Sequence, residues 1–408
     1  MPSLQAFSVQ MLLALAALVA AAVAVWSVLR SRARTRAILR EGRLERAAAA
    51  ESRALNGRYP VEENDPDLLE RRGVARLTAD LMMSDEWTQL GDQIAEWERT
   101  LESTPGGLRF HDVGVKTALS GLKGLIDEMP RTALADLKAA EDELGHFLDT
   151  HRRSADCHVL ALLAARAHLM IGEACRAETW PEELHRDLWR RMAKHFVQAG
   201  EILSDFDPLA YMSPLLAEAH YLQALGSPGG AHRLQQLFED WIDLDPSNPL
   251  IYERHADFLA DDMLVDDASI MAEADKALAR TEGSLGFGGY ALFFLPLLSR
   301  RDGARSMMDD DLFASAVLDL ASMSASQAEV NQAANVLAVE MNSGEGSLAM
   351  RDMFCMIVQS QLEVIYPRLW SLPLAEVQAL VSGSADIVTD EDDYATAPLR
   401  DAVMSRAA

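Results

Sequence analysis

The 408-residue chain has few cysteines and no segment that demands a β-sheet. Cys157, Cys175 and Cys355 are an odd number, and they form neither a C-x-x-C pair nor a disulfide-like spacing. This pattern excludes a disulfide framework and indicates small buried side chains in a reducing compartment. No run of alternating β-branched residues occurs either, so helices are the expected secondary structure.

Positive charge is scarce after the first 60 residues. Residues 1–60 carry nine arginines against three glutamates, whereas the whole chain has a net charge of −26, so residues 61–408 carry −32. A body this acidic repels phosphates, which excludes nucleic acid as an expected partner. The apolar content of 49% is ample for burial. About 350 residues exceed one compact core, so we expect either two domains or an elongated repeat array.

Metal-binding motifs do not rise above chance. Two E-x-x-H pairs occur, Glu143 with His146 and Glu182 with His185. On a helix this spacing points a carboxylate and an imidazole the same way, as in helical di-iron sites. Two pairs are within chance expectation for this composition, and nothing marks the two further glutamates that such a site needs. We therefore expect two solvated helix faces and no metal ligands.

Catalytic and phosphate-binding motifs are equally weak. Cys157 and His158 are adjacent, so on a helix their side chains point about 100° apart and cannot pair by themselves. The glycine-rich segment 283–289 lacks the spacing of a phosphate-binding loop or a dinucleotide fold, and turn or cap positions explain it better. We expect no catalytic residues and no cofactor.

Residues 10–29 form the longest apolar run, and its length matches a bilayer core about 30 Å thick. Trp26 lies near one end, where aromatic side chains collect at a headgroup boundary. The alternative is a cleaved secretory signal. No Lys or Arg precedes Val9, and the apolar stretch exceeds a signal peptide's usual core, so we predict a transmembrane helix.

Arginines follow this run and none precedes it. The first six are Arg30, Arg32, Arg34, Arg36, Arg40 and Arg43. The excess of positive charge on one side predicts an outer N-terminus and a cytoplasmic body. Arg36, Arg40 and Arg43 would share one face of a continuing helix, so they either contact anionic headgroups or act only as a topology signal.

The rest of the sequence is patterned for helices. An apolar stripe with spacing i, i+3, i+4, i+7 is formed by Leu234, Leu237, Phe238 and Trp241. Asp65 before Pro66 predicts a capped helix start, and Ser326 with Glu329 has capping-box spacing. The apolar segment 290–298 is too short to span a bilayer and predicts a buried helix.

One stretch resembles the tetratricopeptide (TPR) family of helical repeats. A helix containing Trp241 ends in the turn Asp-Pro-Ser-Asn, and the next begins near Tyr252. The following small, large and small positions of the motif are filled by Ala256, Leu259 and Ala268. Ala272 stands where the family has a large aromatic, and the other breaks do not follow the 34-residue period. The resemblance covers about residues 180–280.

This resemblance implies stacked helical hairpins with a concave groove that binds peptides or partner proteins. The basic clamp residues that often line such a groove have no counterpart here, so a basic or apolar partner segment is expected. The predicted fold is all-α, with a single N-terminal transmembrane helix followed by an α-solenoid-like array. Its expected parts are an outer N-terminus (1–9), the span (10–29), a basic linker (30–65), the repeat domain (66–382) and an acidic tail (383–408).

The leading hypothesis is an interaction scaffold at the cytoplasmic face of a bacterial inner membrane, because the chain resembles bacterial TPR proteins that have one N-terminal membrane helix. The protein partner is not identifiable from sequence. An enzyme with a hidden, metal-dependent site in the helical body is the alternative. A third hypothesis is a homo-oligomeric structural protein that assembles through its alanine-rich anchor.

Overall fold

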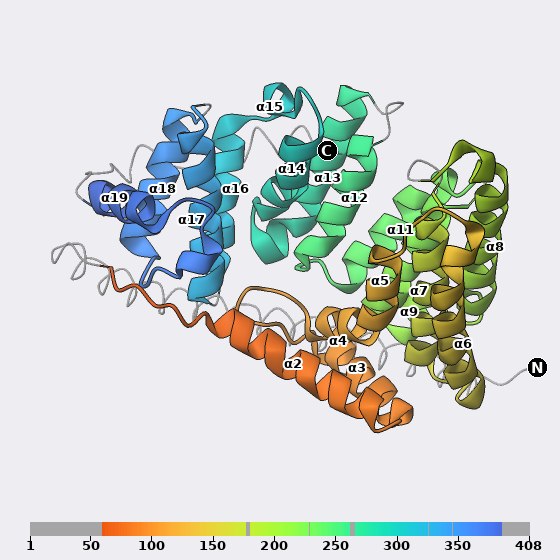
Figure 1. Cartoon of the computed structure of the whole chain (residues 1–408). Helices are drawn as coiled ribbons and strands as arrows, with labels where there is room; N and C mark the ends of the chain where they lie inside the picture. The colour runs from red at the N-terminus through yellow and green to blue at the C-terminus, as the bar shows by residue number, and fades with distance from the viewer. Residues whose placement is uncertain are drawn as a thin grey trace, which may run out of the picture.

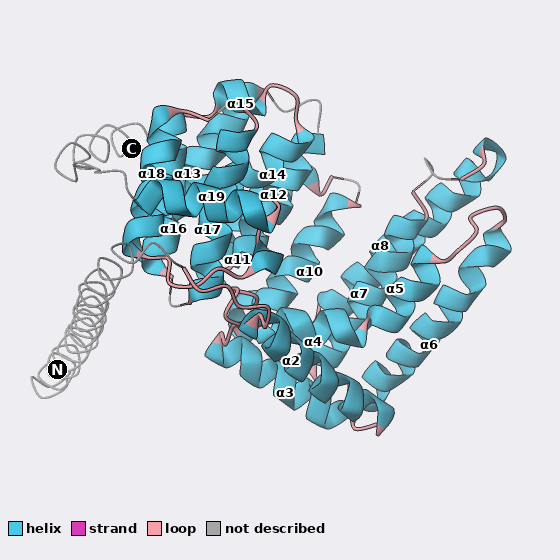
Figure 2. Ribbon diagram, turned by 60° about the vertical axis from the view of Figure 1, so that its left-hand side comes forward, coloured by secondary structure: helices cyan, strands magenta, loops and turns pink. Residues whose placement is uncertain are grey.

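The computed structural model describes residues 59–176, 180–227, 229–261, 266–324, 326–344 and 346–385. Helices dominate these ranges, and the only β-structure within them is two isolated bridges (Figures 1 and 2). The all-α class predicted from the sequence is confirmed for this part of the chain.

The membrane component of the predicted fold class is wrong. Among the described residues, no helix is both long and apolar enough to cross a bilayer. The apolar run 290–298 belongs to α14 (Gly288–Arg300), whose 13 residues measure about 20 Å, against a core of about 30 Å. The residues expected to form or flank the anchor lie outside the described ranges: 10–29, Trp26, Arg30, Arg32, Arg34, Arg36, Arg40 and Arg43.

The helices before residue 212 form an N-terminal lobe around one apolar core. They are α2 (Pro66–Met83), α3 (Trp87–Thr100), α4 (Phe110–Ala118), α5 (Ser120–Asp127), η1 (Leu134–Leu137), α6 (Lys138–Arg153), α7 (His158–Ala174), η3 (Glu182–Leu184), α8 (His185–Leu203) and α9 (Pro208–Tyr211). Helix α7 is apolar on all sides and lies at the centre, in contact with α3, α5, α6 and α8. A helix apolar all round is stable only when buried, which explains this placement.

The helices after residue 230 form a C-terminal lobe around a second core. They are α11 (Ala231–Leu244), α12 (Pro249–Asp261), α13 (Asp267–Leu285), α14, α15 (Ala304–Met307), α16 (Asp310–Met323), α17 (Gln327–Asn342), α18 (Leu348–Ser360), η4 (Pro367–Leu369) and α19 (Leu374–Ala385). Helices α12, α14, α16 and α18 form a row in which each packs against the next, and α17 packs against both α16 and α18. Figure 1 shows this row as neighbouring ribbons from green to blue.

Helix α10 (Pro214–Leu225) belongs to both lobes. Leu216 and Ala219 are buried in the N-terminal core, whereas Tyr221 and Ala224 are buried in the C-terminal core. Its two apolar faces therefore join the lobes through one continuous element, between α7 and α8 on one side and α11 on the other.

The first described segment, residues 59–65, returns to the far end of the chain. The hydroxyl of Tyr59 donates to the Val358 carbonyl of α18 at 3.0 Å, and the N–H of Glu62 donates to the Ile365 carbonyl at 3.0 Å. Helix α2 then packs against α3 and α4 of the N-terminal lobe. In Figure 1, α2 runs along the underside of the described helices, so residues 59–83 contact both lobes.

Candidate functional site

The loop 103–109 between α3 and α4 projects toward the C-terminal lobe and is fixed at its base. The N–H of Gly107 donates to the Thr104 carbonyl at 2.9 Å, and Gly107 has a φ of +83°, a conformation that favours glycine. The carboxylate of Asp67, in the first turn of α2, accepts from the N–H of Gly106 at 2.8 Å and from the Thr104 hydroxyl. The start of α2 therefore sets the position of the loop tip.

The turn 245–249 between α11 and α12 approaches the same loop from the other lobe. The Asn248 side-chain oxygen accepts from the N–H of Leu250 at 3.1 Å, which caps the start of α12. The hydroxyl of Tyr252 donates to the Pro246 carbonyl at 2.7 Å. The Asp-Pro-Ser-Asn sequence is thus held by its own capping residue and by the first turn of the next helix.

Arg109 connects the loop to this turn. Its guanidinium donates to both Asp245 carboxylate oxygens, at 2.8 and 2.6 Å, and to the Ser247 hydroxyl at 2.6 Å. A further N–H donates to the Leu101 carbonyl at 2.9 Å. Arg109 is 8% exposed and Asp245 is fully buried. Such a two-point, charge-assisted contact fixes both distance and orientation between the two segments.

A second polar contact lies beside this ion pair. The side-chain amide of Asn248 donates to Asp112 of α4 at 3.2 Å, and the His111 ring lies 3.8 Å from the same carboxylate. Burial raises the pKa of Asp112 to about 6, with His111 opposing the shift and the carboxylates of Glu218 and Asp245 adding to it. At the junction of the lobes, Asp112 therefore keeps its proton to a higher pH than an exposed aspartate does.

Glu218 of α10 lies behind this cluster and is held in its charged form. It pairs with Arg166 of α7 at 2.8 Å and with Arg254 of α12 at 3.8 Å. Burial alone would raise the pKa of Glu218, but the two guanidinium groups outweigh it and hold the pKa below its usual value. Glu218 thus joins one helix from each lobe to the helix that they share.

A cavity of about 190 Å³ opens beside the loop and the turn, and it is partly open to solvent. Gly106 and Gly107 of loop 103–109 line it from the N-terminal lobe. The other lining residues belong to the C-terminal lobe: Ser247 and Pro249 of the turn, Ser324, and residues of α13, α14, α16 and α17. Because both lobes contribute to its lining, we name it the inter-lobe cavity.

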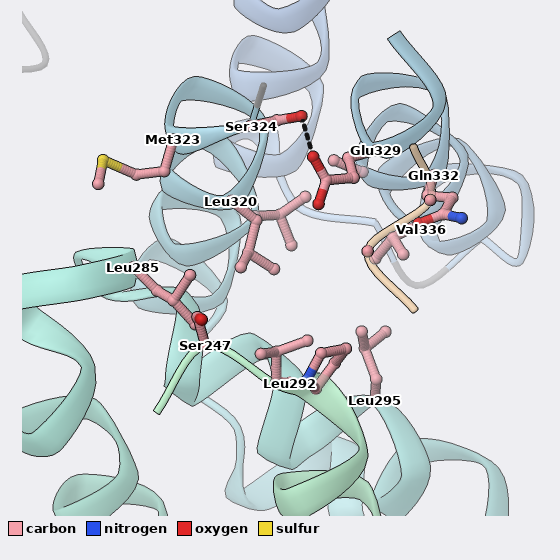
Figure 3. A pocket seen from close by; sticks show the side chains of 15 residues that line it. Ser247, Leu285, Leu292, Leu295, Leu320, Met323, Ser324, Glu329, Gln332 and Val336 are labelled. Carbon is pink, nitrogen blue, oxygen red and sulfur yellow. Dashed lines mark hydrogen bonds between the residues drawn. The ribbon is translucent and has the colours of Figure 1, made fainter. Parts of the chain in front are cut away.

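The walls of the inter-lobe cavity are mainly apolar. Figure 3 shows four half-buried leucines converging on it: Leu285, Leu292, Leu295 and Leu320. Glu329 of α17 supplies a carboxylate at the wall, where it accepts from the Ser324 hydroxyl at 2.5 Å. Gln332 lies one turn further along the same helix. The chemistry available is apolar burial next to one negative charge.

The repeat-packing residues predicted from the sequence lie behind this cavity. Those buried in the C-terminal core are Leu234, Leu237, Phe238, Trp241, Tyr252, Ala256 and Leu259. Ala268 differs, because it lies exposed in the first turn of α13. None of these side chains lines the cavity. They hold α11 against α12 and thereby position the turn 245–249.

Sequence reasoning missed the residues that form the junction. Asp245 belonged to a recognised turn, but nothing in the pattern gave it a partner 136 positions away. Arg109 follows the Pro-Gly-Gly break, which predicts a loop and carries no signal for a buried arginine. The cavity leucines lie on helix faces that periodicity assigns to a core, so their partial exposure was not foreseen.

The other sequence candidates have ordinary partners. The His158 ring is 3.2 Å from Glu98, while Cys157 precedes the first turn of α7. His146 packs edge-on against Trp87, with ring centroids 5.3 Å apart. Within the described ranges, no group of three His, Cys, Asp or Glu side chains is arranged to hold a metal ion.

Comparison with protein-family models, with curated proteins and with solved structures identified no similar protein. The function is therefore argued from the geometry of the cavity and of the surfaces around it.

Proposed function

We propose that this chain is a helical-repeat scaffold that binds a segment of another protein through the inter-lobe cavity. The observation that carries the proposal is an apolar, partly open cavity formed by two lobes held in fixed register. Its volume, about 190 Å³, is below the roughly 300–1,000 Å³ of pockets that enclose small ligands. A space of this size suits an anchoring side chain that a partner inserts, a common feature of protein interfaces.

The expected partner segment has an apolar anchor followed by a basic residue. The leucine walls favour the anchor, since burial of apolar area contributes about 25 cal/mol per Å². Glu329 at the wall and the net charge of −26 favour Lys or Arg next to it. The resemblance of the turn 245–249 to the TPR turn supports the same reading, because TPR proteins bind peptide segments.

The proposal is tested by selecting peptides from a displayed random library on the full-length protein and measuring their affinities for variants. Leu292→Asn places an amide in the apolar wall and is expected to weaken binding at least about tenfold. Glu329→Gln keeps the shape and removes the charge, so it is expected to weaken only those peptides that contain Lys or Arg.

Leu298→Asn is the matched control, because Leu298 is also a half-buried leucine of α14 but does not line the cavity. It is expected to leave peptide affinity unchanged. Equal affinities for wild type, Leu292→Asn and Leu298→Asn would show that the selected peptides bind elsewhere and would overturn the proposal. The thermal stability of each variant is measured by circular dichroism, and affinities are compared only among variants that unfold at the same temperature as wild type.

A further inference from the structure

One face of helix α8 is exposed and does not pack against the N-terminal core. The buried side chains of α8, among them Leu188, Met192 and Phe196, face the N-terminal core. On the opposite face Trp189, Ala193 and Val197 follow one another at i, i+4 and i+8, and Trp189 is 59% exposed. Residues four apart on a helix are neighbours, so these side chains form one apolar stripe.

Three cations lie directly beside this stripe. Arg186, Arg190 and Lys194 also follow one another at i, i+4 and i+8, and all three are exposed. Arg190 pairs with Asp187 of its own helix at 2.8 Å. Arg186 and Lys194 form no ion pair with any other residue in the described ranges. We name the two rows together the α8 face.

The α8 face is unusual for this molecule. Helix α8 contains four Lys or Arg against two Asp or Glu, in a chain whose net charge is −26. Single exposed apolar residues are common on protein surfaces, but a tryptophan beside a row of arginines has the composition of an interface centre. In Figure 1, α8 lies at the outer edge of the N-terminal lobe, on the side away from α16–α19.

We propose that the α8 face is a docking surface for an acidic, amphipathic segment of another protein, about three helical turns long. Charge complementarity identifies the occupant, because its carboxylates would pair with the cationic row while its apolar side chains cover Trp189 and Val197. This site shares no residue with the inter-lobe cavity and selects the opposite charge.

The ends of the face set the length of the occupant. Exposed Glu183 precedes it and exposed Glu201 follows it. The stretch 186–197 between them measures about 18 Å along the helix. A short acidic segment can lie between the two glutamates without contacting them. A flat anionic bilayer would contact both glutamates and be repelled by their charges. A second copy of this chain would bring a further net charge of −26 against the first.

The test uses a displayed library of helical peptides about 12 residues long. Each peptide has apolar residues at i, i+4 and i+8, with either Asp and Glu or Lys and Arg beside them. The library is selected on the full-length protein. We expect acidic members to be enriched. Their affinity is expected to fall at least about tenfold with Trp189→Ala, to be lost with Arg186→Glu, Arg190→Glu and Lys194→Glu combined, and to weaken with added salt.

The matched control reverses three exposed arginines elsewhere, Arg76→Glu, Arg233→Glu and Arg351→Glu combined, and so makes the same change in net charge. It is expected to retain peptide binding, as is Glu329→Gln in the cavity. Failure to enrich acidic peptides, unchanged affinity of acidic peptides in the α8 reversal, or equal loss with the control would overturn the proposal. Binding to phosphatidylglycerol vesicles that only the α8 reversal removes would assign the face to a lipid surface. A dimer in sedimentation that the reversal dissociates would assign it to self-association.

Discussion

Arg109 and Asp245 are 136 positions apart and meet through two hydrogen bonds with little exposure to water. A buried pair of this kind adds little net stability as a whole, because both charges are desolvated. Removal of one partner leaves the other charged and buried. We therefore predict that Arg109→Ala lowers the free energy of unfolding by about 3–5 kcal/mol, measured by urea denaturation.

Replacement of both partners, Arg109→Ala with Asp245→Ala, is the control for this prediction. The double variant is expected to lose less stability than the sum of the two single variants, since neither charge is then left alone. Strict additivity would show that the two side chains act independently and that the ion pair does not set the register of the lobes.

Asp112 makes stability depend on pH in an unusual direction. Burial raises its pKa from 3.8 to about 6, so the folded protein binds this proton more tightly than the unfolded chain. Its contribution to stability therefore falls as pH rises from about 4 to about 6, and the full cost remains above that range. The groups that face it are His111, Glu218, Asp245 and Asn248.

Asp112→Asn removes this titration and keeps an oxygen for the Asn248 amide. We predict that the variant gains stability relative to wild type as the pH rises from about 4 to about 6.5, by at most about 3 kcal/mol. Thermal unfolding of both proteins across this range measures the difference. A difference that stays constant with pH would show that Asp112 does not titrate in this window.

At the scale of elements, two glycines from one cluster have opposite roles. Gly289 lies in the first turn of α14 against α13, where a Cβ would lie 2.6 Å from the Ala277 carbonyl oxygen. Gly283 lies in the last turn of α13, and a Cβ there would meet nothing within 4 Å. Gly289→Ala is predicted to cost about 1–3 kcal/mol through overpacking, and Gly283→Ala to add about 0.5–1 kcal/mol.

Urea denaturation of the two variants measures both effects under the same conditions. Because the substitutions add the same methyl group within six residues, they differ only in the space that receives it. Equal effects in both variants would contradict the close packing of α13 against the start of α14.

Helix starts were predictable because their signals are local. Asp65 accepts from the N–H of Asp67 and Pro66 opens α2, as the sequence predicted. Ser326 likewise accepts from the N–H of Glu329 at the start of α17. The second half of the capping box is absent, because the Glu329 carboxylate accepts from Ser324 and the N–H of Ser326 donates to the Ser324 hydroxyl. The Ser324 hydroxyl thus accepts from the N–H of Ser326 in place of the Glu329 carboxylate that a capping box would use.

Burial was predictable from periodicity, whereas long-range pairing was not. The stripe from Leu234 to Trp241 lies in a core, and the apolar run 290–298 forms a buried helix. Periodicity says which face of a helix is covered but not which helix covers it. The position of loop 103–109 depends on Asp67, Arg109 and Asp245 together, and no local pattern connects them. The inter-lobe cavity therefore lay beyond what a single sequence reveals.

At the scale of the whole molecule, several contacts connect the lobes, including the following three. Helix α10 contributes to both cores, Arg109 binds Asp245, and the Ser326 hydroxyl at the start of α17 donates to the Pro105 carbonyl in loop 103–109. The second and third connections lie beside residues that line the inter-lobe cavity, Ser247 and Gly106. The shape of the cavity is consequently a property of the joined lobes, and separation of the lobes would remove one side of it.

This arrangement predicts that the lobes unfold as one cooperative unit. Native-state hydrogen exchange in low denaturant is expected to give α7 and α16 the same opening free energy, because neither core is complete without α10. In Arg109→Ala, which breaks one connection, the two values are expected to separate as the lobes open independently. Arg76→Ala, at an exposed position of α2, is the control and should leave them equal. Unequal values already in the wild type would mean that the lobes are separate folding units and that the cavity opens without global unfolding.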